Sequence, residues 1–222
     1  MEKRDKQFIY YWYKEFSWSS DPFKKGIPVP VELFIVGYEN ERKKLNYFII
    51  ENQKICFIES DIGMGKSSLV KWIKHELLSF PNITVLFVDK SFSRKQFLLE
   101  LIKPLLSFKE KFFFTGSDFK VKKFLGMIHD DNFKNIVECL LYDNSLLDFN
   151  KLLSFLNSRM KKHFILLVDD INELVPENIK IIQFFLMNNF NAQMILSGDK
   201  KFFDKLSPKV KPLKIILESL DY

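Results

Sequence analysis

The chain contains one stretch from which the rest can be interpreted: Glu59-Ser60-Asp61-Ile62-Gly63-Met64-Gly65-Lys66-Ser67-Ser68. A short apolar run, 55–58, precedes it, and an apolar-periodic pattern over 69–78 follows it. A strand, a glycine-rich turn and Gly-Lys-Ser at the start of a helix are the context that a phosphate-binding loop requires. In such a loop the backbone N–H groups and the helix N-terminus hold a triphosphate largely by main chain. We therefore expect the loop residues 60–68 to bind the phosphates of a nucleotide.

Two side chains of this loop carry expected chemical roles. Lys66 would reach the β- and γ-phosphates, and Ser67 would offer its hydroxyl to Mg²⁺. The full pattern has glycine six positions before the lysine, where this chain has Ser60. Ser60 therefore either adopts an ordinary backbone conformation or carries strain. The alternative interpretation is a flexible turn before a helix that Ser67 caps.

A second stretch ends in paired carboxylates. Five apolar residues, 164–168, are followed by Asp169 and Asp170. A run of this length suits a central parallel strand that is covered on both faces. Its carboxyl end is where α/β sheets bind their ligands. We expect Asp169 to hold the Mg²⁺ shell and Asp170 to polarise the attacking water, although such a pair also occurs by chance at a surface.

Composition limits the class of protein. The 222 residues suit a single α/β domain, and 47% hydrophobic with 28% charged residues is typical of a globular chain. The net charge of +6 permits an acidic partner, but one alanine against 25 phenylalanines indicates the compositional drift of an AT-rich genome. Cys56 and Cys139 form no metal-binding pattern, so a reducing cytoplasm is expected. No apolar run approaches the roughly 18 residues of a membrane span.

The remaining segments give a coarse order of elements. Residues 1–36 are predicted to form an aromatic, extended wrap on a core that spans 37–222. Further strands are expected at 83–89, 193–197 and 211–218, and helices at 94–106, 131–141, 146–160 and 176–188. The segment 108–124 alternates lysines with phenylalanines. It is open between a helical hairpin with ordinary packing and a surface for single-stranded nucleic acid.

Together these features resemble the AAA+ ATPases, in the branch of general-secretion-pathway, transposition-regulator and archaeal origin-recognition-like ATPases. The residues that carry the resemblance are Pro22-Phe23, the segment from Phe34 to Glu41, Walker A from Ser60 to Ser67, Walker B from Ile165 to Asp170 and a sensor-1-like segment from Met194 to Leu206. The resemblance implies a three-layer αβα P-loop NTPase fold, with a five-stranded parallel sheet in the order 5-1-4-3-2. It implies ATP and Mg²⁺ as ligands, Ser197 or Asp199 as the sensor near the γ-phosphate, and Val36, Gly37 and Tyr38 beside the base.

The chain departs from that family at points that bear on activity. Asp170 stands where hydrolysing members usually carry glutamate. The arginines are Arg4, Arg42, Arg94 and Arg159, and none occupies the usual finger position near the last strand, where Lys209 and Lys211 stand. A missing finger can cost about 10³–10⁵ in rate. The lid that follows the core in the family, with its sensor-2 arginine, is not expected within these residues.

Three functions remain open from the sequence. The first is an ATPase that hydrolyses Mg²⁺–ATP slowly and gates a conformational change in a protein partner or a homo-oligomer. The second is a nucleotide switch or scaffold without hydrolysis. The third is a DNA-associated ATPase of the replication-initiation or transposition-regulator kind, for which the basic composition is the argument.

Overall fold

The computed structural model describes residues 38–88, 92–114, 118–142, 145–160, 163–204 and 211–218. These residues belong to one compact unit that spans Ile35–Tyr222. The predicted wrap at 1–36 lies outside the described residues, as do Val36, Gly37 and Lys209.

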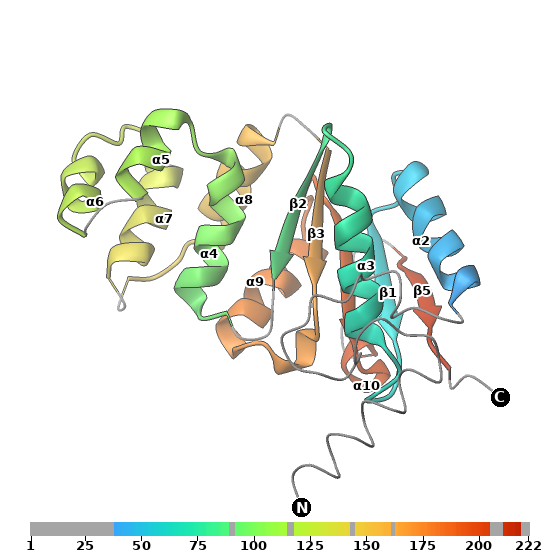
Figure 1. Ribbon diagram of the computed structural model, residues 1–222. Coiled ribbons are helices and arrows are strands. Elements are labelled where there is room, and N and C mark those ends of the chain that lie inside the picture. Colours follow the sequence, from blue (N-terminus) through green and yellow to red (C-terminus); the bar gives the residue numbers. More distant parts are fainter. Residues whose placement is uncertain are drawn as a thin grey trace, which may run out of the picture. The chain divides into compact units, whose positions relative to one another are not determined.

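A five-stranded parallel sheet forms the centre of this unit (Figure 1). Its strands are β1 (Ile55–Glu59), β2 (Ile83–Val88), β3 (His163–Val168), β4 (Gln193–Gly198) and β5 (Leu213–Ile216). Their order across the sheet is β2-β3-β4-β1-β5, which is 5-1-4-3-2 from the other edge. The predicted topology is confirmed.

The inner strands are buried on both faces, as the continuous apolar runs of the sequence predict. Every residue of β1 and β4 is buried, and so is all of β3 after His163. The edge strand β5 differs, because Lys214 and Ile216 are exposed while Ile215 is buried. Runs of this kind form central strands, since a parallel sheet with helices on both sides leaves neither face to solvent.

Helices cover both faces of the sheet and complete three layers (Figure 1). On one face α3 (Lys66–Leu78) packs across β2, β3 and β4, and α2 (Glu39–Ile50) packs beside β5. On the other face lie α4 (Arg94–Ile102), α9 (Pro176–Met187) and the short α10 (Lys200–Phe203). Alternate strand residues such as Phe57, Leu166 and Leu196 enter a single apolar core with α4 and α9.

A group of further helices follows α4. It contains the 3₁₀ turn η2 (Lys103–Leu105) and the helices α5 (Phe108–Phe114), α6 (Asp118–Leu125), α7 (Asp131–Leu141) and α8 (Phe149–Arg159). Asp130 and Asp148 cap α7 and α8 by accepting hydrogen bonds from their first backbone N–H groups, which satisfies donors that a helix start leaves open. Phe133 of α7 stacks on Phe155 of α8 with ring centroids 4.9 Å apart. The described part of 108–124 thus forms two helices.

None of the helices in the described ranges has the length and apolar character that crossing a bilayer requires.

Candidate functional site

The glycine-rich loop lies between the end of β1 and the start of α3. Gly63 and Gly65 have φ angles of +89° and +82°, in the left-handed region that favours glycine. Ser60 is not among the non-glycine residues with positive φ in the described chain. The exchange of the expected glycine for Ser60 therefore adds no strain of this kind. The Ser60 hydroxyl donates to the backbone carbonyl of Asp61 at 3.0 Å.

Lys66 is the first residue of α3, and its ammonium folds back over the loop. Nζ donates to the carbonyl oxygens of Ser60 at 2.7 Å and of Asp61 at 3.0 Å. It also lies 3.6 Å from Oδ1 of Asp199, which follows β4. The lysine side chain is almost fully buried. One cation is thus concentrated at the mouth of the loop, where a phosphate would enter.

Ser67 and the carboxylate after β3 meet although they lie 102 residues apart in sequence. The Ser67 hydroxyl donates to Oδ1 of Asp169 at 3.0 Å, and the buried Ser197 hydroxyl donates to the same oxygen at 3.1 Å. The ends of β1, β3 and β4 bring these groups together because parallel strands end at one edge of the sheet. The hydroxyl and carboxylate oxygens are ligands that suit Mg²⁺.

Asp170 adopts a left-handed backbone conformation, with φ 57° and ψ 64°. Its backbone N–H donates to Ser197 Oγ at 2.9 Å, so β4 holds the turn after β3 in place. Left-handed conformations of residues other than glycine cost about 1–3 kcal/mol and concentrate at functional sites. The strain thus lies directly after Asp169.

Asn172 has a role that the sequence did not indicate. Its Oδ1 accepts the backbone N–H of Asp199 at 3.2 Å, and its Nδ2 lies 3.5 Å from Oδ2 of the same aspartate. Gly198 permits this approach, because a Cβ there would stand 2.8 Å from Asn172 Oδ1 and from Ile171 Cγ2. The turn after β3 therefore orients the carboxylate of Asp199. No spacing rule identifies such a pairing between two loops.

Tyr38 is the one predicted base-pocket residue that the structure describes. Its hydroxyl donates to the carbonyl of Met64 at 2.9 Å, and its ring lies where a Cβ on Gly65 would be 3.5 Å from Cε2. A cavity of about 580 Å³ opens on the same loop, within the usual size of ligand pockets. It is lined by Glu59, Ser60, Asp61, Met64, Lys200, Ile216, Leu217 and Glu218. Glu59 is buried there beside Lys214 Nζ at 3.0 Å.

The remaining loop residues are more open. The Ile62 side chain is 89% exposed at the tip, and Ser68 is half-buried in the first turn of α3. A ligand held here would be held by main-chain groups of the tip, since Ile62 offers no polar side chain.

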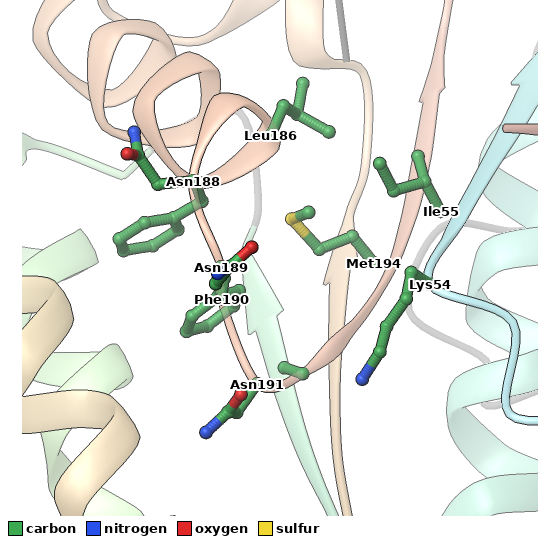
Figure 2. A pocket seen from close by; sticks show the side chains of 10 residues that line it. Lys54, Ile55, Leu186, Asn188, Asn189, Phe190, Asn191 and Met194 are labelled. Atoms are coloured by element: carbon green, nitrogen blue, oxygen red, sulfur yellow. The ribbon is translucent and has the colours of Figure 1, made fainter. Parts of the chain in front are cut away.

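A second cavity, of about 320 Å³, lies at the opposite end of the strands (Figure 2). Ile55 at the start of β1 and Met194 near the start of β4 line it, together with Lys54, Asn188 and Asn191. Ligands of parallel α/β sheets bind at the carboxyl ends of the strands. The candidate nucleotide site is therefore the loop edge.

Within the described residues no group of three or more His, Cys, Asp or Glu side chains gathers as a metal site. A Mg²⁺–nucleotide complex does not require one. Mg²⁺ keeps several waters and takes one or two protein ligands plus phosphate oxygens. Ser67 and Asp169 fit that requirement by their chemistry and their separation.

The sheet order and the loop between β1 and α3 define the class: this chain has the αβα fold of a P-loop NTPase. Cdc6p from Pyrobaculum aerophilum has a similar structure, with a TM-score of 0.52 and 11% identity over 88% of this chain. That likeness supports an AAA+ ATPase-like fold. Drosophila ORC bound to DNA matches 84% of this chain and 44% of its own at 13% identity, with a TM-score of 0.46. This chain spans 47% of the Cdc6p chain. No protein-family model and no curated protein matches the sequence.

Proposed function

We propose that this chain binds Mg²⁺–ATP at its loop edge and hydrolyses it slowly, to gate a conformational change in a protein partner or a second copy of itself. The observation that carries the proposal is the 3.0 Å contact between Ser67 Oγ and Asp169 Oδ1. A phosphate loop and a strand-end carboxylate have to meet in this way if both are to hold one Mg²⁺. A flexible turn that Ser67 merely caps has no reason to place this hydroxyl on a distant carboxylate.

Each site residue then has an assigned role. The backbone of residues 60–68 and the start of α3 hold the phosphates, and Lys66 binds the β- and γ-phosphates. Ser67 and Asp169 hold Mg²⁺, which neutralises the charge that develops on the phosphate oxygens. Asp170 orients and polarises the attacking water, while Ser197 and Asp199 lie near the γ-phosphate. Tyr38, with Val36 and Gly37, borders the base.

The test is a titration with a fluorescent ATP analogue in the presence of Mg²⁺. Lys66→Ala removes the buried ammonium and is expected to weaken binding by more than about tenfold, or about 1.4 kcal/mol. Lys71→Ala is the matched control, since Lys71 is an exposed lysine on the same helix. Retained affinity in Lys66→Ala would contradict the assignment of the loop.

A nucleotide switch without hydrolysis is the second candidate, and the arginines favour it. Arg42 lies over the ring of Trp72, Arg94 donates to the carbonyl of Ser145, and Arg159 pairs with Glu110. Each described arginine thus has a structural contact within the fold. A turnover assay with Mg²⁺–ATP separates the candidates, because a switch binds the nucleotide and releases no phosphate.

The DNA-associated ATPase stays a proposal that the same assay tests. Lys122 and Lys123 are exposed near the end of α6, as an electrostatic surface for nucleic acid requires. Turnover stimulated by DNA would support it. Turnover that DNA leaves unchanged would exclude DNA as the activator.

A further inference from the structure

The ion pair between Lys66 and Asp199 places a negative charge at the mouth of the phosphate loop. Asp199 Oδ1 lies 3.6 Å from Lys66 Nζ, and its side chain is 43% exposed while that of Lys66 is 9% exposed. The two other contacts of this ammonium are the carbonyls of Ser60 and Asp61. Asp199 therefore occupies the open side of the lysine, which is the side that a ligand reaches.

The position of Asp199 is braced from a second element. Asn172 accepts the backbone N–H of Asp199 and lies 3.5 Å from its Oδ2, so the other oxygen is directed at Lys66. Gly198 allows this bracing because no Cβ separates β4 from the turn after β3. The carboxylate is thus a fixed part of the site as well as an exposed charge.

A γ-phosphate and Asp199 would compete for the same ammonium. The lysine of such a loop reaches both the β- and the γ-phosphate, so a triphosphate needs the side of Lys66 that Asp199 occupies. If the carboxylate stays in place, it faces the γ-phosphate oxygens across a few ångströms, and two like charges at that distance repel. A diphosphate has no γ-phosphate and can contact Lys66 while the ion pair persists.

We propose that Asp199 is a specificity determinant that makes this site bind a nucleoside diphosphate more tightly than the corresponding triphosphate. The proposal rests on the proposed nucleotide site and adds to it a preference for the product state. A site of this kind retains ADP after hydrolysis, which slows turnover. A neutral side chain at this position would bind the γ-phosphate without this repulsion.

The test measures the affinities of ADP and of a non-hydrolysable ATP analogue, both with Mg²⁺, by calorimetric titration of the whole chain. The wild type is expected to bind ADP about tenfold more tightly or better. Asp199→Asn keeps the size of the side chain and its polar contacts with Asn172 but removes the charge. It is expected to raise affinity for the triphosphate about tenfold and to change ADP affinity by less than about threefold.

Asp204→Asn is the matched control. It removes the same charge one turn further along, where Asp204 lies 4.0 Å from Lys214. Both affinities should keep their wild-type ratio in this variant.

The outcomes separate the two proposals. If the wild type binds neither nucleotide, the nucleotide site itself is wrong and this inference fails with it. If both nucleotides bind and Lys66→Ala weakens both, but Asp199→Asn leaves their ratio unchanged, the nucleotide site stands and the role of Asp199 is overturned. An equal shift in Asp204→Asn would show a general effect of net charge and would also overturn it.

Discussion

Two ion pairs in this molecule use the same chemistry for different ends. In the helical layer, Arg159 of α8 grips Glu110 of α5 with two parallel contacts, Nη1–Oε2 and Nη2–Oε1, each 3.1 Å long. At the loop edge, Lys66 and Asp199 face each other through a single contact of 3.6 Å. The first pair is bidentate and its partners are satisfied. The second is longer, more open, and shared with backbone carbonyls.

The difference lies in what surrounds each cation. The Arg159 guanidinium lies over the rings of Phe133 and Phe155, 5.7 and 5.1 Å from their centroids, and the Ser107 N–H also donates to Glu110. A planar fork with aromatic neighbours fits one partner and holds it. A lysine ammonium is a compact charge that can exchange partners. The helical pair therefore stabilises the fold, and the loop pair remains available to a ligand.

Asp170→Asn tests the functional side of this comparison with the largest expected effect. It should leave nucleotide affinity intact and lower turnover at least about 100-fold, because an amide cannot accept a proton from the attacking water. Asparagine tolerates the left-handed conformation of this position, so the fold should persist. Phosphate release under saturating Mg²⁺–ATP measures it.

Glu173→Gln is the control for that variant, since Glu173 is an exposed carboxylate in the same 3₁₀ turn. Its turnover should equal that of the wild type. Turnover that persists in Asp170→Asn and disappears in Glu173→Gln would transfer the role of the base to Glu173.

Gly198→Ala tests whether the loop pair depends on the packing between the turns after β3 and β4. The new Cβ would meet Asn172 Oδ1 and Ile171 Cγ2 at 2.8 Å, so one turn has to shift. We expect a loss of about 2 kcal/mol in the free energy of unfolding, which urea denaturation measures. Gly126→Ala is the control, because its nearest contact would be 3.7 Å from the carbonyl of Lys123. An unchanged midpoint in Gly198→Ala would show that Asn172 does not brace Asp199 tightly.

Arg159→Ala tests the structural side of the comparison. It removes the guanidinium from Glu110 and from two aromatic rings, at an expected cost of about 1.5 kcal/mol in unfolding free energy. Nucleotide affinity should stay at the wild-type value. Arg159→Lys keeps the charge and loses the fork, so we expect about half of that cost. If both variants unfold like the wild type, the bidentate geometry contributes nothing to stability.

The sequence predicted the parts of the fold that depend on local pattern. The apolar runs at 55–58 and 164–168 became central strands, and the helix after Lys66 begins at that residue. The strand order came from the family resemblance, since apolar runs alone do not say which strands are neighbours. The grip of Arg159 on Glu110 joins residues 49 positions apart and had no local signal.

The site was predictable to the same limit. Strand-end logic brought Ser67 and Asp169 to one edge, and the structure places them in contact. Ser197 was expected near the γ-phosphate, and its hydroxyl is found on Asp169 and on the N–H of Asp170. Asn172 was missed because its role depends on the approach of two turns. The roles of these residues toward a nucleotide stay predictions.

The smallest expected effect concerns the dependence of the helical pair on pH. Burial alone would raise the pKa of Glu110, but hydrogen bonds from Arg159 and Ser107 and the arginine charge outweigh it and hold the pKa below the ordinary value of 4.5. A carboxyl whose pKa is lower in the folded state adds stability at a pH above its unfolded value. That stability is lost as the pH falls below about 4.5 and then through the lower pKa of the folded state.

Because other carboxylates titrate over the same range, the measurement is a difference between wild type and Glu110→Gln. At pH 7 the variant should be less stable by about 1 kcal/mol, since the neutral amide forms weaker bonds to Arg159. At pH 3 the protonated wild-type side chain also lacks the charge, so the gap should narrow. The loop pair has no such contribution to the fold, and Asp199→Asn should show a gap near zero at both pH values. A gap for Glu110→Gln that stays constant between pH 7 and pH 3 would mean that its packing, and not its charge, holds α5 to α8.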